Sequence, residues 1–397
     1  MTTRTETLPI QQEKSTSLFT AGFALFSMFF GAGNLIFPLL IGKSVGENWW
    51  YAILGLGITA VIVPFLGLAG MIFFQADYHR FFGRIGTIPG YLLLLLLQLI
   101  LGPFGVIPRL FTLMHAILKP YFPELALLSF SAVAAIIVFL CTFKKQNIIK
   151  LLGVILTPIL LLSLAGLFIS GFIHPANEMI AKTSASESFM EGLLGGYNTM
   201  DLIAAFLFAT VVLPYFQKEV VFKTSLNSKE SLSKKLFYSS LIAATLLLFT
   251  YTGLSYISAY HGEISGSYQS EELLGSIAIK LLGPTGSFIA TIAVVTACLT
   301  TAISLTSIFA DYLRKDLCKA KISPIVGLII TLIITMCFAN LGFTGINAFL
   351  SPILQICYPG LIVLTILNIL HHTTGFKVIK TPVFLTFAAS AIFYFMG

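Results

Sequence analysis

The chain has 397 residues, of which 57% are hydrophobic and only 10% are charged, and its mean hydropathy is +0.95. Soluble domains carry roughly 25% charged residues, so this composition excludes an ordinary soluble domain. The formal net charge of +7 does not indicate nucleic-acid binding, because the basic residues gather in particular loops. The composition predicts an all-α, polytopic membrane protein.

Apolar runs of about twenty residues recur along the whole chain and predict eleven membrane-spanning helices. Residues 1–16 are polar and are predicted to form a cytoplasmic N-terminal tail with no cleavable signal peptide. The predicted spans lie at about residues 17–41, 49–74, 88–117, 125–143, 149–173, 198–217, 236–260, 285–312, 323–341, 346–370 and 380–396.

The distribution of Lys and Arg predicts the orientation of these spans. If the N-terminus is cytoplasmic, most of the 23 Lys and Arg residues lie on the cytoplasmic side, as the positive-inside rule requires. The loop 261–284 shows helical apolar spacing over a length too short to span, which predicts an amphipathic helix over the outer mouth.

The predicted topology indicates an inverted repeat. Spans one to five (17–173) begin inside and spans six to ten (198–370) begin outside, with residues 380–397 as a peripheral eleventh span. The first span is interrupted by glycines, and its partner, the sixth span, should carry a break of its own. We expect that break at Leu207–Thr210, ahead of Pro214.

The first span contains Phe30-Gly31-Ala32-Gly33-Asn34, followed by Pro38. Such an interruption frees backbone groups that lipid cannot satisfy, so it predicts a protein-walled binding site at mid-membrane. Free amides and the positive end of the following half-helix suit a carboxylate, whereas free carbonyls near Phe206–Ala209 suit an ammonium group or a metal cation. Together the two breaks fit an α-amino acid. The alternative is a close helix crossing that small residues permit.

Span eight contains a cluster of hydroxyl groups at Thr300, Thr301 and Ser304. With carbonyls from a broken neighbour, these oxygens can form a site for a hard cation such as sodium. The alternative is that each hydroxyl bonds a carbonyl of its own helix.

Two charged residues are candidates for a gate or for proton transfer. Asp201 is the one acidic residue near the interior of a predicted span, where ionisable groups are usually functional. We favour a capping role for it at the outer end of span six, with an outer-gate or proton role second. Arg109 follows Gly102 and two prolines in span three; it can pair with Asp201 or with an outer glutamate, or extend to the lipid headgroups.

No motif of a hydrolase, zinc protease or nucleotide-binding enzyme is present, so the chain is not expected to be an enzyme or to hold a cofactor. The quoted stretches resemble the branched-chain amino acid:cation symporter family, the bacterial branched-chain amino acid transport system II carriers. The residues that carry the resemblance are Phe29–Pro38, Gly102-Pro103 with Ile107-Pro108-Arg109, Gly196-Tyr197 with Thr199-Met200-Asp201, and Ala297–Ile303.

This resemblance implies the five-plus-five inverted-repeat fold of the LeuT type. The transporter LeuT is the standard example of that fold. It also implies a sodium site made by the Ala297 carbonyl, the Thr300 and Thr301 hydroxyls, and backbone oxygens near Ser27 and Phe30. The substrate site would comprise Phe30, Gly31, Ala32, Gly33, Asn34, Gly102, Phe206, Phe208 and Ala209. Members of the family usually have twelve helices, and they usually have glycine where Ser304 stands here.

The resulting expectation is a symporter in the bacterial cytoplasmic (inner) membrane that imports Leu, Ile and Val with sodium by alternating access. Its expected partners are a small amino acid and the lipid bilayer, with no nucleic acid and no obligatory protein partner. The alternatives are a proton-coupled symporter in which Asp201 carries the proton, and an amino acid sensor that does not transport.

Overall fold

The computed structural model describes residues 18–142, 157–173, 181–221, 228–261 and 269–396. Within these ranges the fold is all-helical, and the one strand-like feature is an isolated bridge between Gly46 and Ala181. The first half of the chain contains α1 (Leu18–Phe29), α2 (Ala32–Val45), α3 (Trp49–Gly57), α4 (Val63–Phe73), α5 (Tyr78–Phe82), α6 (Thr87–Leu101), α7 (Val106–Leu118), α8 (Leu127–Thr142) and α10 (Thr157–Ile173). The second half contains α11 (Ala185–Thr199), α12 (Asp201–Val221), α13 (Ser228–His261), α14 (Leu273–Tyr312), α15 (Pro324–Ala339), α16 (Gly342–Thr374) and α17 (Lys380–Met396).

Each of the eleven predicted spans coincides with a helix or with an interrupted helix in the described parts of the chain. By length and composition, six helices and the bent pair α1–α2 are long enough to cross a membrane, and α8, α10, α15 and α17 are shorter apolar helices. The predicted tail 1–16, the start of span five and the start of the outer loop lie outside the described residues.

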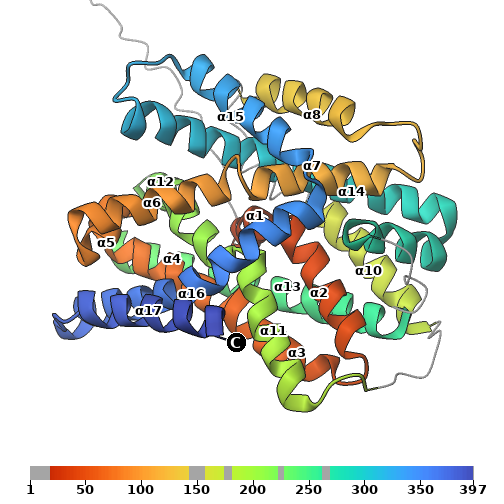
Figure 1. Cartoon of the computed structure of the whole chain (residues 1–397), viewed down its shortest axis with the longest axis horizontal. Coiled ribbons are helices and arrows are strands. Elements are labelled where there is room, and N and C mark those ends of the chain that lie inside the picture. Colours follow the sequence, from red (N-terminus) through yellow and green to blue (C-terminus); the bar gives the residue numbers. More distant parts are fainter. Residues whose placement is uncertain (1–17, 143–156, 174–180, 222–227, 262–268, 397) are drawn as a thin grey trace, which may run out of the picture.

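The helices pack in two groups, which Figure 1 shows in different parts of the molecule. In one group α1 and α2 pack against α13, α11 packs against α3, and α12 packs against α4. In the other group α14 packs against α7, α8, α10 and α15. α7, α8, α14 and α15 lie in the upper half of Figure 1, whereas α2, α3 and α11 lie below them. The bent pair α1–α2 also contacts the second group, through α7 and α14.

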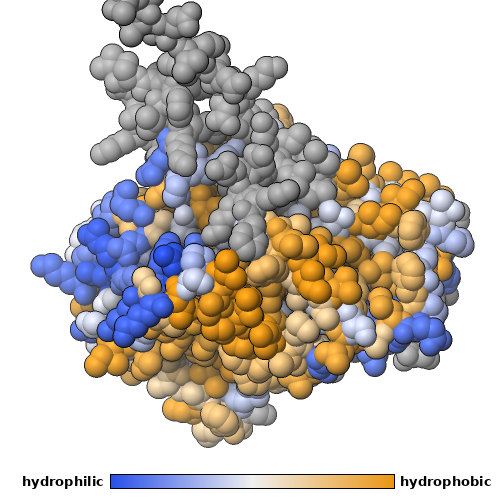
Figure 2. Space-filling model, turned by 90° about the horizontal axis from the view of Figure 1, so that it is seen from above, coloured by the Kyte–Doolittle hydropathy of each residue, from blue (hydrophilic) through white to orange (hydrophobic). Residues whose placement is uncertain are grey.

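The outer surface suits a bilayer. Many large apolar side chains are exposed, among them Leu162, Ile169 and Phe393. Figure 2 shows broad apolar areas across the face that it views, with hydrophilic residues gathered mainly at its edges. Exposed apolar surface of this extent is typical of a lipid-facing protein.

The sixth span begins earlier than the sequence predicted, at Ala185 instead of residue 198. Ser184 caps it: the backbone N–H of Glu187 donates to the Ser184 hydroxyl at 3.3 Å, and the Ser184 N–H donates to the Glu187 carboxylate at 2.8 Å. This capping box satisfies the first amide groups of a helix that the sequence analysis counted as outer loop. The predicted boundary is wrong because the first half of the helix is too polar to register as an apolar run.

The amphipathic helix predicted in the outer loop is present as the first part of α14. Leu273, Leu274, Ile277 and Ala278 are buried on one face of it. Gly283 then adopts φ 67°, a left-handed conformation that favours glycine, and it bends the chain ahead of Pro284. A Lys119–Glu272 ion pair at 2.9 Å fastens the start of this helix to the end of α7.

Candidate functional site

The break in the first span lies where the glycine pattern predicted it. α1 and α2 are bent by 72°, and Phe30 and Gly31 between them are not helical. The side-chain oxygen of Asn34 accepts a hydrogen bond from the Gly31 N–H at 3.0 Å and so caps α2. The first amide groups of α2 have no partner within the helix, and they mark its positive end.

The break in the sixth span lies at Met200, not at Leu207–Thr210. Met200 is left-handed (φ 64°, ψ 19°) and separates α11 from α12. Phe206–Ala209 lie inside the continuous helix α12, where backbone carbonyls are bonded along the helix, so the predicted position is wrong. The error follows from the misplaced start of the span, which displaced its middle toward the C-terminus.

The two breaks meet. A Cβ atom added to Gly33 would lie 3.0 Å from the Cα of Thr199 and 3.4 Å from the Asn198 carbonyl oxygen. The close approach of α2 to the end of α11 therefore leaves little room for a larger side chain at this position. The negative end of α11 and the positive end of α2 consequently face the same small region.

A buried hydrogen-bond network joins the breaks through side chains. The Asn34 amide donates to the Asp201 carboxylate at 2.7 Å and also to the Tyr251 hydroxyl, which itself donates to Asp201 at 3.0 Å. The Tyr358 hydroxyl accepts from the Leu202 N–H at 3.0 Å, which satisfies one of the first amide groups of α12. All four side chains are at most 2% exposed.

Asp201 is therefore buried between the two breaks, in the middle of the interrupted sixth span. It is the first residue of α12, where a carboxylate complements the helix dipole, so part of the expected capping role is present. Asp201 also lines the cavity between the two breaks, a position that the sequence analysis did not predict.

A third interruption brings Arg109 into the interior. α6 ends at Leu101 and α7 begins at Val106, and Arg109 lies in the first turn of α7 with 1% of its surface exposed. Its guanidinium donates to the Asn198 carbonyl at 3.0 Å and to the Asn347 side chain at 2.7 Å. It makes no ion pair with Asp201 or with any other acidic residue in the described ranges, and it does not extend to the surface.

A small cavity of about 20 Å³ lies between these elements. Its lining joins the first, third, sixth and eighth spans. Polar groups come from Asn34, Arg109, Thr199, Asp201 and Thr301, and the apolar remainder comes from Met28, Phe29, Leu101, Val106, Met200, Ala204, Phe208 and Leu305, with Gly31, Ala32 and Gly33 at the first break.

Four of the predicted substrate residues do not line this cavity. Phe206 packs against Phe81 and Phe82, with ring centroids 5.2 and 5.3 Å apart. Gly102 lies against Phe309, which a Cβ atom would approach to 2.8 Å. Phe30 stacks on Phe26 at 4.9 Å, and Ala209 is buried within α12. The predicted residues Gly31–Asn34 and Phe208 are the ones that the structure brings together.

Two of the three hydroxyl groups in the eighth span donate to the same carbonyl. Thr300 and Thr301 both donate to the Ala297 carbonyl, at 2.8 and 3.1 Å, and Ser304 donates to the Thr300 carbonyl at 3.0 Å. The helix-internal bonds that the sequence left as an alternative are therefore formed. Thr301 nevertheless lines the cavity, and its methyl group lies 3.9 Å from a Cβ atom built on Gly31.

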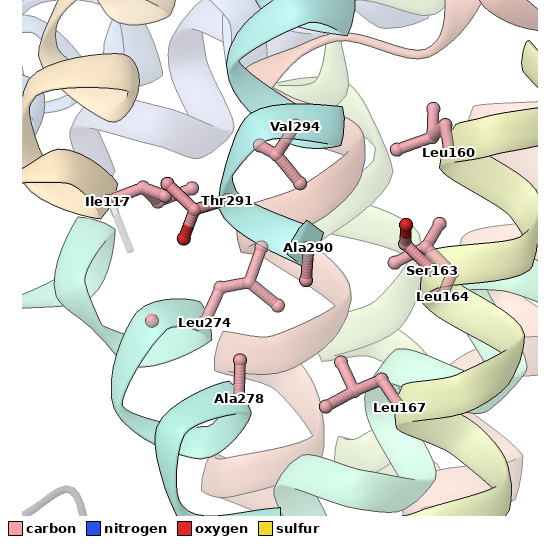
Figure 3. Close-up of a pocket in the computed structure, with 11 residues that line it drawn as sticks. Ile117, Leu160, Ser163, Leu164, Leu167, Leu274, Ala278, Ala290, Thr291 and Val294 are labelled. Carbon is pink, nitrogen blue, oxygen red and sulfur yellow. The ribbon is translucent and has the colours of Figure 1, made fainter. Parts of the chain in front are cut away.

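A second small cavity, of about 10 Å³, lies between α7, α10 and the two parts of α14, and Figure 3 shows its lining. Leucine side chains from α10 face Leu274 and Ala278, and Ser163 and Thr291 supply its hydroxyl groups. It contains no charged group and none of the predicted site residues. It offers nothing that would recognise a charged substrate.

The described fold is similar to that of solved transporters. The inward-facing conformation of Mhp1 matches with a TM-score of 0.65 at 14% identity, covering 95% of this chain and 88% of that chain. A Na⁺-coupled sialic acid symporter matches with a TM-score of 0.57 at 12% identity, covering 96% and 88%. The expected LeuT-type transporter fold is thereby confirmed, while identities this low indicate the fold alone.

The sequence identifies the family. A putative branched-chain amino acid carrier protein of Staphylococcus epidermidis is 30% identical over 357 residues, which cover 85% of this chain and 78% of the relative. The branched-chain amino acid permease BrnQ of Bacillus subtilis is 29% identical over 362 residues, covering 88% and 80%. The family model described as branched-chain amino acid transport protein matches residues 14–396. The chain belongs to the branched-chain amino acid transport protein family.

Proposed function

We propose that this protein is a symporter that imports leucine, isoleucine and valine, driven by a sodium gradient through alternating access. The observation that carries the proposal is the meeting of two broken helices, at Gly31 and Met200, in a cavity lined by apolar side chains. Opposed half-helix ends at mid-membrane are where transporters of this fold bind substrate and coupling ion. The membership of the family supports the substrate class.

The charged groups of the substrate are assigned to opposite sides of the cavity. The carboxylate is placed at the amide end of α2, around Ala32 and Gly33, where N–H groups have no helical partner. The ammonium group is assigned to the Asp201 carboxylate at the start of α12. This assignment replaces the carbonyls near Phe206–Ala209, which are engaged within α12.

The aliphatic side chain of the substrate is assigned to the apolar part of the cavity. Phe29 and Phe208, whose ring centroids lie 5.8 Å apart, form one wall, and Val106 of the third span contributes another. Burial of a leucine-sized group gives about 2 kcal/mol of preference over alanine, so discrimination among the three branched substrates is expected to be mild. Because the cavity is small, its walls must separate to admit a substrate.

Sodium is assigned to the oxygens between the first and eighth spans. Ala297 supplies a carbonyl oxygen, and the Thr300 and Thr301 hydroxyl oxygens each lie within hydrogen-bond distance of it. The last carbonyls of α1, near Ser27 and Phe30, have no helical partner, and α1 packs against α14. Hard cations prefer such oxygen ligands.

The test is uptake of radiolabelled leucine into proteoliposomes under an imposed sodium gradient at equal pH. We expect sodium-driven uptake in the wild type and its loss in Thr300→Ala/Thr301→Ala. Thr296→Ala is the matched control, because Thr296 lies on the same helix, bonds its own Ile292 carbonyl at 2.6 Å and lies outside the cavity. Leucine binding without uptake under any gradient would contradict a transport function.

Proton coupling is the second candidate, and the central position of Asp201 favours it. Uptake driven by a pH gradient and indifferent to sodium would establish it in place of sodium coupling. In Asp201→Asn, loss of gradient-driven accumulation with retention of leucine exchange would identify a proton carrier. Loss of both would instead identify a substrate ligand.

We further place the protein in the bacterial cytoplasmic membrane with its N-terminus in the cytoplasm. The bias of Lys and Arg toward one side supports this orientation. Protease protection of a tag added before Met1, in sealed inside-out vesicles, would contradict it.

A further inference from the structure

Arg109 carries a buried charge that the described protein does not neutralise. The side chain is 1% exposed, and no acidic residue within the described ranges lies within ion-pair distance of it. Removing an ion from water costs several kcal/mol even after the surroundings relax, so buried charges are normally paired. A guanidinium in this state is expected to meet an anion that reaches it from outside the fold.

The position of the guanidinium indicates where that anion binds. Arg109 lines the cavity, and one terminal nitrogen donates to the Asn198 carbonyl, the same oxygen that closely approaches Gly33. Arg109 therefore lies beside the amide end of α2. The rings of Phe37 and Phe343 lie 5.6 and 5.5 Å from its central carbon and hold the group in place.

Arg109 retains donors for a ligand. A guanidinium has five N–H groups in a fixed fork, and the two hydrogen bonds to Asn198 and Asn347 use two of them. The Nε atom is buried and has no protein partner. Free N–H groups in this geometry suit a carboxylate, which arginine binds through two parallel hydrogen bonds.

We infer that Arg109 binds the α-carboxylate of the transported amino acid and makes that carboxylate a condition of recognition. The inference rests on the proposed function and deepens it. Arg109 and Asp201 line one cavity without pairing with each other, so the site presents separated positive and negative poles. A zwitterionic head group neutralises both poles, whereas an amino alcohol or an amine leaves Arg109 unpaired.

The experiment compares leucine with leucinol, which keeps the ammonium group and side chain but replaces the carboxylate with a hydroxymethyl group. Each affinity is obtained from the thermal stabilisation of the purified full-length protein as ligand is titrated, a readout that works for weak ligands. For the wild type we expect leucinol to bind at least about 100-fold more weakly than leucine. A site with hydrogen-bond donors for a polar group strongly disfavours a ligand that lacks that group.

In Arg109→Gln we expect the preference for leucine over leucinol to fall to within about threefold, chiefly through weaker leucine binding. Arg109→Lys keeps the charge but not the fork, and we expect it to retain part of the preference. Lys119→Gln is the matched control: it removes one positive charge next to the end of the same helix, where Lys119 pairs with Glu272 outside the cavity, and should leave the preference unchanged.

If Arg109→Gln lowers the affinities for leucine and leucinol equally, Arg109 has a purely structural role and the inference is overturned. Equal binding of leucine and leucinol by the wild type would overturn it as well, even if the variant fails to fold. Both results leave the proposed function standing. Absence of leucine binding to the wild type would overturn the proposed function itself, together with this inference.

Discussion

The two breaks that form the site are built in different ways. The break in the first span has glycine at its turning point, and its cap comes from its own segment, because the Gly31 N–H donates to the Asn34 side chain at 3.0 Å. The break in the sixth span has no glycine at its turning point: Met200 is left-handed, and the freed backbone groups are satisfied by Arg109 and Tyr358 from other helices. The first break is thus local, whereas the second depends on its neighbours.

Removing the side chain that joins the breaks should have the largest effect. Asn34→Ala removes the cap on Gly31 and one donor to the buried Asp201 carboxylate, each a loss of about 1–3 kcal/mol. We expect leucine uptake by proteoliposomes to fall about 100-fold or more, as two such losses imply. Asn340→Ala, at an exposed position where the side chain bonds the Met336 carbonyl, is the control. Uptake within about twofold of wild type in Asn34→Ala, a difference of less than 1 kcal/mol, would show that the network is dispensable.

The two glycines of the first break should respond differently. A Cβ atom at Gly33 meets the backbone of Thr199, whereas a Cβ atom at Gly31 meets its nearest neighbours at 3.8 Å or more. Overpacking costs about 1–3 kcal/mol, so we expect Gly33→Ala to lower uptake about tenfold. Gly31→Ala should lower it much less. The same assay at equal protein density measures both, and equal losses would contradict the close approach of the two breaks.

The smallest expected effect is on stability, and it comes from branching of the side chain at Met200, the residue at the second break. Left-handed backbone is costlier for a β-branched residue than for an unbranched one. Met200→Ile should therefore be less stable than its isomer Met200→Leu by about 1 kcal/mol. The apparent melting temperature in detergent measures the difference. Equal melting temperatures would mean that Met200 does not need its left-handed conformation.

The sequence predicted the parts of the site that are encoded locally. Apolar length identified the spans, and Gly31 and Gly33 identified the first break. The second break was misplaced because α11 is polar enough to resemble a loop, with Glu187 and Glu191 on its exposed side. The pattern Ser184-x-x-Glu187, a capping box, was the one local signal that could have located the start of that helix.

Other parts of the site had no local signal. Tyr251 is one of 14 tyrosines, and nothing in its neighbours marks it as the one that reaches Asn34 and Asp201. The burial of Arg109 likewise follows from the interruption at Gly102–Gly105 and from the packing of α7 against α2 and α16. Such contacts between distant segments are decided by the fold as a whole.

The bridge between Gly46 and Ala181 has a mechanical consequence. It joins the far end of α2 to the segment before α11, where the Lys182 side chain also donates to the Lys43 carbonyl at 3.0 Å. The near ends of the same two helices are joined at Gly33 and Thr199. α2 and α11 are thus in contact near both of their ends, and we expect a motion that opens the cavity to carry these two helices together.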